Sequence, residues 1–331
     1  MSKRVVLVIL VLFLVVPAAV RGQEFTAETL DAVVKVRAQV PSEARTARTL
    51  GPLREGSGAI IDSKGLVLTI GYLILEASQV QVTDSSGRTV PAKVLGYDHA
   101  SGFGLLRALS AVGGARPLSL GLSESLDQGA EVLILSHAEN GPSGQGAYVV
   151  SRREFAGYWE YLLDKAIFTA PHHANFGGAA LIDRSGRLLG IGSLQVPEAI
   201  PGQPVPGNMF VPIDLLKPIL SDLAQKGSSG ARRRPWLGVQ MEEVGRHVVV
   251  RRVSRGGPAA RSGLEPGQLI AGVGGAPVAG LADLYRKVWA LGTPGVSVPL
   301  NVLKGVRVEE VQVVSGDRYD YLRLKPTVMS R

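Results

Sequence analysis

The chain has 331 residues, of which 45% are apolar, 5% aromatic and 19% charged, and its formal net charge is +8. This length suits two globular domains. Because the sequence has no cysteine, it excludes disulfide frameworks, thiolate metal sites and cysteine nucleophiles. The basic residues are scattered apart from the triplet at 232–234, and no nucleic-acid motif occurs. Nucleic acid is therefore not an expected partner.

The first 22 residues have the pattern of a secretory signal peptide. A basic start is followed by twelve apolar residues at 5–16 and then by a small-residue stretch that ends at Gly22. Twelve residues are too few for a membrane-spanning helix, which needs roughly 20. We expect cleavage near Gly22 and export to the periplasm or the outside of the cell. The alternative is an uncleaved segment that anchors the protein to the membrane.

Residues 24–225 form the first predicted domain, in which short β-branched runs alternate with turns. The motifs at 62–65, 84–87 and 183–186 each read Asp-x-x-Gly and separate two such runs, which predicts hairpin turns. Many short strands with a turn about every ten residues favour an all-β barrel or sandwich pair. Helical patterns occur only at the edges, over 26–36 and 213–225. The predicted strand runs begin at Ala59, Val67, Val80, Ala92, Gly104, Val132, Ala147, Ala166 and Leu188.

A linker at 226–234 is predicted from its Gly-Ser-Ser-Gly segment and the adjoining arginine triplet, and it precedes a second domain at 235–331. The tail after Val314 alternates polar and apolar residues, which favours a last strand. Its tyrosines at 319 and 321 are expected to pack on the first domain.

The order of these motifs resembles the HtrA/DegP-type trypsin-like serine proteases. The segment 56–69 and the strands that follow at 80–96 are similar to the first barrel of that family, and 175–192 is similar to its second barrel around the nucleophile loop. The segment 208–217 resembles its closing strand and helix. The resemblance implies a mainly β fold with two six-stranded, trypsin-like barrels, followed by a PDZ-like α+β domain.

The same resemblance indicates that the catalytic triad is not intact. The positions of the family's histidine, aspartate and serine correspond to Tyr72, Gly102 and Phe176. Tyrosine, with an unperturbed pKa of about 10, is a poor base near neutral pH. Glycine has no group to orient an imidazole, and phenylalanine offers no nucleophile. The chain is therefore identified as a degenerate member of the family, a pseudoprotease.

Alternatives remain around this site. His99, His172 and His173 lie close in sequence to the altered positions, so a rebuilt hydrolase site is one hypothesis. The backbone amides of Gly177 and Gly178 are candidates for an oxyanion-like nest. Adjacent histidines on a strand point to opposite faces, and no third ligand follows from spacing, so we expect no metal and no cofactor.

The second domain carries a candidate peptide groove. The segments at 236–239 and 256–267 are similar to the carboxylate-binding loop and the following motif of PDZ domains, and a helix is predicted near 281–291. A peptide's C-terminus would pair with the strand at 239–242, while backbone amides of the loop hold its carboxylate. The alternative is an ordinary core that closes the groove. The candidate groove residues are Leu237, Gly238, Val239, Met241, Leu284 and Val288.

These observations predict an exported pseudoprotease that binds peptide segments or C-termini of envelope proteins as an adaptor, a holdase or a regulator of assembly. The alternative is an active serine endopeptidase of envelope protein quality control with a non-standard site. The resemblance further implies trimers formed through the amino-terminal region, residues 24–40, or a hetero-oligomer with an active paralogue. Contact with a membrane is expected only if the first segment is uncleaved.

Overall fold

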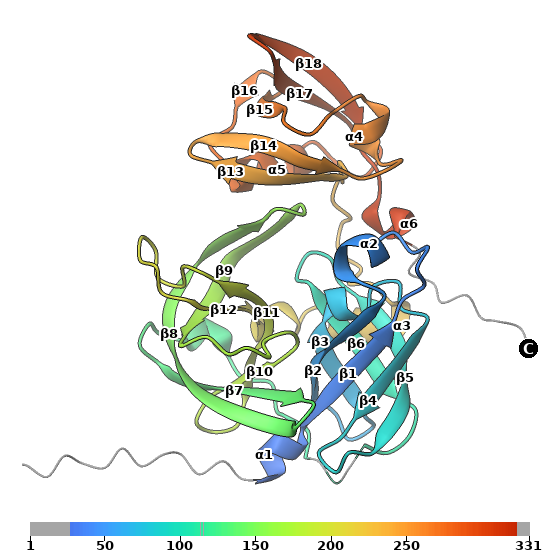
Figure 1. Cartoon of the computed structure of the whole chain (residues 1–331), viewed down its shortest axis with the longest axis vertical. Helices are drawn as coiled ribbons and strands as arrows, with labels where there is room; N and C mark the ends of the chain where they lie inside the picture. Colours follow the sequence, from blue (N-terminus) through green and yellow to red (C-terminus); the bar gives the residue numbers. More distant parts are fainter. Residues whose placement is uncertain (1–26, 113, 115, 323–331) are drawn as a thin grey trace, which may run out of the picture.

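A computed structural model describes residues 27–112, 114 and 116–322, and it contains two β-barrels and a separate sheet (Figure 1). The sheet lies above the barrels in this view, and a hairpin of the second barrel reaches up to it. The predicted signal peptide lies outside the described residues. Within the described part of the chain, no helix is long and apolar enough to cross a membrane.

The first barrel closes in the strand order β1-β2-β3-β6-β5-β4, with every neighbouring pair antiparallel. Full closure satisfies the backbone groups that an edge strand would expose. The short helix α2, Ala47–Leu50, lies between the first two strands, and the 3-10 turn η1, Gly71–Leu73, follows the third. The strands are β1 Val33–Gln39, β2 Leu53–Ile60, β3 Leu66–Ile70, β4 Gln79–Thr83, β5 Thr89–Tyr97 and β6 Phe103–Ala108.

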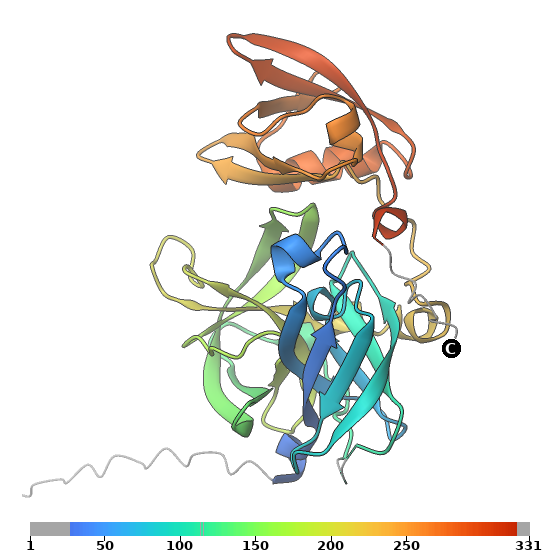
Figure 2. The ribbon, with the colours of Figure 1, turned by 45° about the vertical axis from the view of Figure 1, so that its right-hand side comes forward.

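The second barrel closes in the order β10-β11-β12-β9-β8-β7. Its longest hairpin joins β8 to β9 through a turn at 158–160, and both strands extend well beyond the barrel wall toward the third domain (Figure 2). The strands are β7 Glu131–Ala138, β8 Gly141–Gly157, β9 Tyr161–Ala170, β10 Ala180–Ile182, β11 Leu188–Val196 and β12 Gly207–Pro212. Short 3-10 turns accompany them: η2 Ser123–Ser125 and η3 Ile213–Leu215.

The three predicted Asp-x-x-Gly turns are confirmed, and they share one local design. In each, the first aspartate accepts backbone N–H bonds from the residues two and four positions later, as Asp183 does from Ser185 (2.8 Å) and Arg187 (3.0 Å). The closing glycine has positive φ, for example +75° at Gly186. All nine predicted strand runs fall in barrel strands.

One edge helix was predicted wrongly. The helix α1, Ala27–Asp31, ends after five residues, and the rest of the 26–36 pattern becomes β1. The helix prediction missed the alternation in β1, where Val34, Val36 and Ala38 are buried while Arg37 and Gln39 are exposed, and the strand pairs on both sides. The second edge helix is confirmed in part: η3 and then α3, Leu220–Lys226, occupy 213–226.

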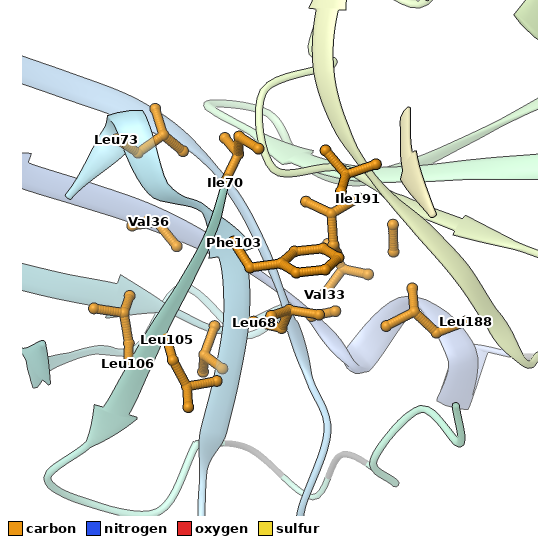
Figure 3. Close-up of a cluster of buried hydrophobic side chains, with 14 of the residues drawn as sticks. Val33, Val36, Leu68, Ile70, Leu73, Phe103, Leu105, Leu106, Leu188 and Ile191 are labelled. Carbon is orange, nitrogen blue, oxygen red and sulfur yellow. The ribbon is translucent and has the colours of Figure 1, made fainter. Parts of the chain in front are cut away.

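One apolar core runs through the first barrel and into the second. Phe103, fully buried, lies between Leu68 and Val33 of the first barrel and Leu188 and Ile191 of the second (Figure 3). The barrels are thus joined by continuous packing, which fixes the backbone on both sides of the boundary between them.

The third domain is a sheet in the order β13-β14-β15-β17-β18, with β16 paired to β15. The helix α5 carries Leu284, Tyr285 and Val288 into the core of this domain. Its elements are β13 Val239–Val244, β14 His247–Val253, α4 Pro258–Arg261, β15 Leu269–Val273, β16 Ala276–Pro277, α5 Leu281–Ala290, β17 Ser297–Lys304 and β18 Arg307–Val314.

The tail is not the predicted strand. It forms the short helix α6, Arg318–Tyr321, capped by the side chain of Asp317. The prediction that its aromatic pair packs on the first domain is confirmed, since Tyr319 and Tyr321 lie against a cluster that contains Tyr97 and Leu75. The tail therefore ties the third domain to the first barrel beside the linker.

Candidate functional site

The structure brings together the three positions at which the resemblance expects a catalytic triad. Gly71 N donates to the carbonyl of Gly102 (2.7 Å), which places Tyr72 beside Gly102. On its other side, the Tyr72 hydroxyl is so close to the loop after Phe176 that a Cβ on Gly177 would lie 2.9 Å from it. The backbones on both sides of the cleft therefore hold these positions as neighbours.

Tyr72 bridges the cleft as a structural donor. Its hydroxyl donates to the carbonyl of Ser193 on β11 (3.0 Å), and its own carbonyl accepts from buried Arg54 (2.8 Å). Burial raises the pKa of the Tyr72 phenol above its usual value, so it keeps its proton. A group that holds its proton and donates it to a carbonyl cannot serve as a base.

The other two positions offer no reactive group. Gly102 has φ of +85°, and a Cβ there would lie 3.2 Å from the Tyr161 hydroxyl, which itself donates to the neighbouring carbonyl of Ser101. Phe176 is half-buried, and its carbonyl accepts from Ala179 N (3.0 Å). Neither position can orient an imidazole or attack a carbonyl.

The predicted two-amide nest at Gly177 and Gly178 does not form. Gly178 N donates to the carbonyl of Gly192 (2.9 Å), so this amide cannot join that of Gly177 in binding an anion. The carbonyl of Gly177 accepts from Ser57 N (2.8 Å), which stitches this loop to the first barrel. The loop is used for packing between barrels, a contact that sequence spacing does not reveal.

In the third domain, the five predicted groove side chains, Leu237, Val239, Met241, Leu284 and Val288, are all buried in one cluster. Gly238 has φ of +80°, a conformation that turns its own amide and those of its two neighbours toward the same point. The three amides therefore converge on a position where one carboxylate can accept from all of them.

A carboxylate already lies there, and it belongs to the same chain. The Glu160 side chain accepts from Leu237 N (2.8 Å), Gly238 N (2.8 Å) and Val239 N (3.1 Å). Glu160 is in the turn between β8 and β9, and only 3% of its surface is exposed. The tip of the second barrel's hairpin thus occupies the carboxylate position of the groove.

Further contacts seat the hairpin along the groove. The carbonyl of Tyr158 accepts from Met241 N on β13 (2.9 Å), and the carbonyl of Gly157 accepts from the Tyr285 hydroxyl on α5 (2.8 Å). Leu162 of β9 is buried in the third domain's apolar cluster. Sequence reasoning did not find Glu160, Leu162 or Tyr285. The one local signal is the run Tyr158-Trp159-Glu160-Tyr161, which is unusually aromatic in a chain with 5% aromatics.

Comparison with known proteins agrees with this architecture. Residues 56–191 match the family described as trypsin-like peptidase domain, and 235–314 match the PDZ domain. The chain therefore carries a trypsin-like peptidase domain followed by a PDZ domain. Among its relatives are a probable periplasmic DegP-like serine endoprotease of Brucella suis, 27% identical over 79% of this chain and 52% of the relative, and the putative serine protease HhoA of Synechocystis, 28% identical over 76% and 68%. The chain spans about half the length of the Brucella relative.

Solved structures share the fold. A serine endoprotease from Yersinia pestis aligns with a TM-score of 0.52 at 22% identity, covering 88% of this chain and 97% of that one. The HtrA-type protease AlgW with a tripeptide aligns with a TM-score of 0.51 at 22% identity, covering 88% and 97%. At this identity the likeness concerns the arrangement of the domains and leaves the chemistry of this chain to its own residues.

The histidines close in sequence to Gly102 and Phe176 have other partners. His99 accepts or donates through Nδ1 to the Tyr97 hydroxyl (3.1 Å) and meets Arg318 of α6 through Nε2 (2.6 Å). Burial, followed by nearby Arg318 and Arg234, holds the pKa of His99 well below its usual value. It stays neutral and structural at the junction of the first barrel and the tail. His172 is exposed.

His173 is part of a buried polar chain in the second barrel. Its Nε2 lies 2.8 Å from the Ser136 hydroxyl, and its Nδ1 lies 3.1 Å from the side-chain oxygen of Gln145. Ser136 is fully buried, so no substrate reaches its hydroxyl in this conformation. Among the described residues, no group of three or more acidic or histidine side chains is placed to hold a metal ion.

The Glu160 carboxyl is electrostatically unusual. Burial raises its pKa from 4.5 to about 7, although the three loop amides and Arg318 act in the opposite direction. At neutral pH this group therefore lies close to its midpoint, unlike an exposed glutamate. The charge of the Glu160 carboxyl at neutral pH therefore depends on whether the hairpin is docked in the groove.

Proposed function

We propose that this HtrA-type chain is an exported pseudoprotease that binds the C-termini or extended segments of envelope proteins, as an adaptor, a holdase or a regulator of assembly. The observation that carries the proposal is that Tyr72, Gly102 and Phe176 lie together at the boundary between the barrels, where none supplies a base, an orienting carboxylate or a nucleophile. Export is supported by the amino-terminal pattern and by a relative named as periplasmic.

Peptide binding is supported by the carboxylate loop of the PDZ domain. Three converging amides hold a carboxylate in this structure, and the adjacent strand β13 offers a further amide to an extended segment. Recognition of this kind uses main-chain hydrogen bonds for affinity and a side-chain pocket for specificity. It needs no catalytic residue, so it survives the loss of a triad.

The test is a pair of assays on the purified mature protein. We expect no cleavage of unfolded casein, and we expect binding of peptides with a free apolar C-terminus that is lost when the terminus is amidated. Casein cleavage that survives repurification would overturn the pseudoprotease. Equal binding of free and amidated peptides would overturn the role of the carboxylate loop.

One observation favours the alternative, an active serine endopeptidase. Hydrogen bonds join Ser136, His173 and Gln145 in the order of a nucleophile, a base and an orienting acceptor, but Ser136 is fully buried, so cleavage would need the barrel to open around it. If this chain cleaves casein, Ser136→Ala should abolish the cleavage and Ser143→Ala, which changes a neighbouring hydroxyl, should leave it. Retention of cleavage in Ser136→Ala would remove this candidate.

Assembly is part of the proposal through the family resemblance. Trimers, or mixed assembly with an active paralogue, were expected through 24–40, yet β1 within this range is built into the first barrel on both sides. A contact through this region would therefore use residues other than the buried face of β1. Light scattering of the mature protein, alone and mixed with an active paralogue, measures both outcomes.

A further inference from the structure

The β8–β9 turn lies in the PDZ groove in the register of a bound peptide. Glu160 meets the loop amides of Leu237, Gly238 and Val239, and two residues earlier the carbonyl of Tyr158 accepts from Met241, two residues after Val239. Steps of two in opposite directions are the pairing of antiparallel strands. One main-chain hydrogen bond and a side-chain carboxylate of the turn thus take positions along β13 that the backbone and the terminus of an extended ligand would use.

We propose that this turn is an internal ligand of the groove, in which Glu160 takes the place of a peptide's terminal carboxylate, and that a free C-terminus binds only by displacing it. This inference rests on the proposed peptide-binding function and adds its regulation. The closed chain is the resting state, and release of the hairpin is the step that makes the groove available.

The backbone at Glu160 shows how a continuing chain imitates an end. Its φ is +59°, a left-handed conformation that is rare for a residue with a side chain. This conformation turns the main chain away from the groove while the carboxylate stays in the loop. Its own amide donates to the Tyr285 hydroxyl (3.3 Å), so α5 supports the turn. The turn is held in this strained form by its contacts with the PDZ domain.

The remaining contacts around the hairpin suit a reversible closure. Arg286 on α5 pairs with Glu154 of β8 and with Asp164 of β9 (2.7 Å), but all three side chains are exposed. Exposed ion pairs add little to stability. Arg318 of α6 donates to the carbonyl of Trp159 (2.9 Å). The carboxylate in the loop and the packing of Leu162 are therefore the main determinants of the closed state.

Closure has a measurable effect on affinity. A peptide that competes with an internal ligand binds more weakly than it binds the open groove, by the ratio of closed to open molecules. Removing the internal carboxylate should raise the affinity for a free C-terminus without changing any residue of the loop, β13 or α5. This separates competition from a defect in the groove itself.

The experiment uses the full mature chain and a fluorescent peptide with a free C-terminal valine, with its amidated form as the reference. Glu160→Ala should bind the free peptide at least tenfold more tightly than the unaltered chain. The matched control is Glu139→Gln, an exposed glutamate at the β7–β8 turn, which should not change the affinity. Tyr285→Phe, which removes the hydroxyl that supports the turn, should raise the affinity by a smaller factor and covers the case that Glu160→Ala fails to fold.

Hydrogen exchange at residues 237–241 gives a readout independent of peptide. We expect faster exchange in Glu160→Ala, slowed again by the free-terminus peptide. Equal peptide affinity in the unaltered chain and Glu160→Ala would overturn the internal ligand and leave the proposed function standing. If Glu160→Ala exchanges faster at residues 237–241 but binds no peptide, the proposed peptide binding and the competition with a peptide would be overturned. The occupation of the loop by Glu160 would still stand. No binding and no change in exchange would overturn both.

Discussion

The cleft between the barrels and the groove of the PDZ domain differ in what they retain. At the cleft, Tyr72 and the loop of Phe176 meet across well-packed backbone, but the side chains carry out packing and hydrogen bonding only. At the groove, the backbone amides and apolar lining are in place, and they hold a segment of the same chain. One site has a scaffold without reactive groups, while the other has binding groups that are already in use.

The difference follows from what each kind of site requires. A Ser-His-Asp triad depends on three particular side chains, which Tyr72, Gly102 and Phe176 do not supply. A carboxylate loop depends on the direction of main-chain amides, which a glycine with positive φ and close packing preserve through many side-chain changes. The same property makes the loop easy to fill from within, because any glutamate on a nearby turn supplies the carboxylate.

The largest expected effect tests how much the contact between the two barrels at Gly178 contributes to stability. In Gly178→Ala, the new Cβ would lie 1.9 Å from the carbonyl oxygen of Ser57, and the residue would keep φ of +74°. We expect a loss in free energy of unfolding on the order of 4 kcal/mol or more, measured by denaturant titration.

Gly186→Ala is the matched control for this change. It has nearly the same φ, +75°, with nothing within 4 Å of its Cβ, so it should lose only about 1 kcal/mol. Equal losses in the two variants would mean that left-handed backbone, and not contact between the barrels, accounts for the effect. The cleft would then be looser than its packing indicates.

The next effect concerns the pH dependence of the groove. Because burial raises the pKa of Glu160 from 4.5 to about 7, the docked hairpin holds a proton that the released hairpin gives up above about pH 4.5. Docking is therefore favoured at pH 5 and weakens as the pH rises through 7. The affinity for a free C-terminus should increase roughly 10- to 100-fold from pH 5 to 8, which is about 2 kcal/mol. Titration of the fluorescent peptide at each pH measures it.

Two other titratable side chains, His99 and Tyr285, lie close to Glu160. His99 stays neutral over this range because its pKa is held well below the usual value, and burial raises the pKa of Tyr285 above its usual value. Glu160→Gln has no proton to lose and should show a flat profile. A profile of the unaltered chain that is flat, or that falls with pH, would contradict the assignment. Glu160 and His99 line a cavity beside the linker. The remaining charged groups that line this cavity are Asp98, Arg232, Arg233, Arg234, Asp317 and Arg318.

Sequence reasoning reached most of the fold because its signals are local. The Asp-x-x-Gly turns work through hydrogen bonds within five residues, and β-branched runs between them give the strands. It failed at β1, where membership of a barrel depends on pairing with both β2 and β4. The alternation of β1 is present from Val34 on, but the run is short and follows α1 after a single residue, so a helical period was read through both.

The candidate site was predictable to a similar limit. The cleft positions Tyr72, Gly102 and Phe176 follow from motif order, and the groove residues follow from the loop and helix of the PDZ domain. The occupant does not, because Glu160 lies 77 residues before Leu237 and carries no motif. Closure of the groove by a distant turn depends on how two domains pack, and no motif in a single sequence indicates that packing.

The smallest effect tests what Tyr72 does at the cleft. If its hydroxyl serves only to join η1 to β11, Tyr72→Phe loses one hydrogen bond to the Ser193 carbonyl and should lower the free energy of unfolding by about 1 kcal/mol. Tyr148→Phe, on an exposed tyrosine, should cost less than half of that. Neither change should alter peptide binding, because the cleft and the groove have separate hydrogen-bond partners. A loss of peptide affinity in Tyr72→Phe alone would show that the two sites are coupled through the second barrel. Tyr72 and the PDZ groove would then act as one linked site rather than as two independent ones.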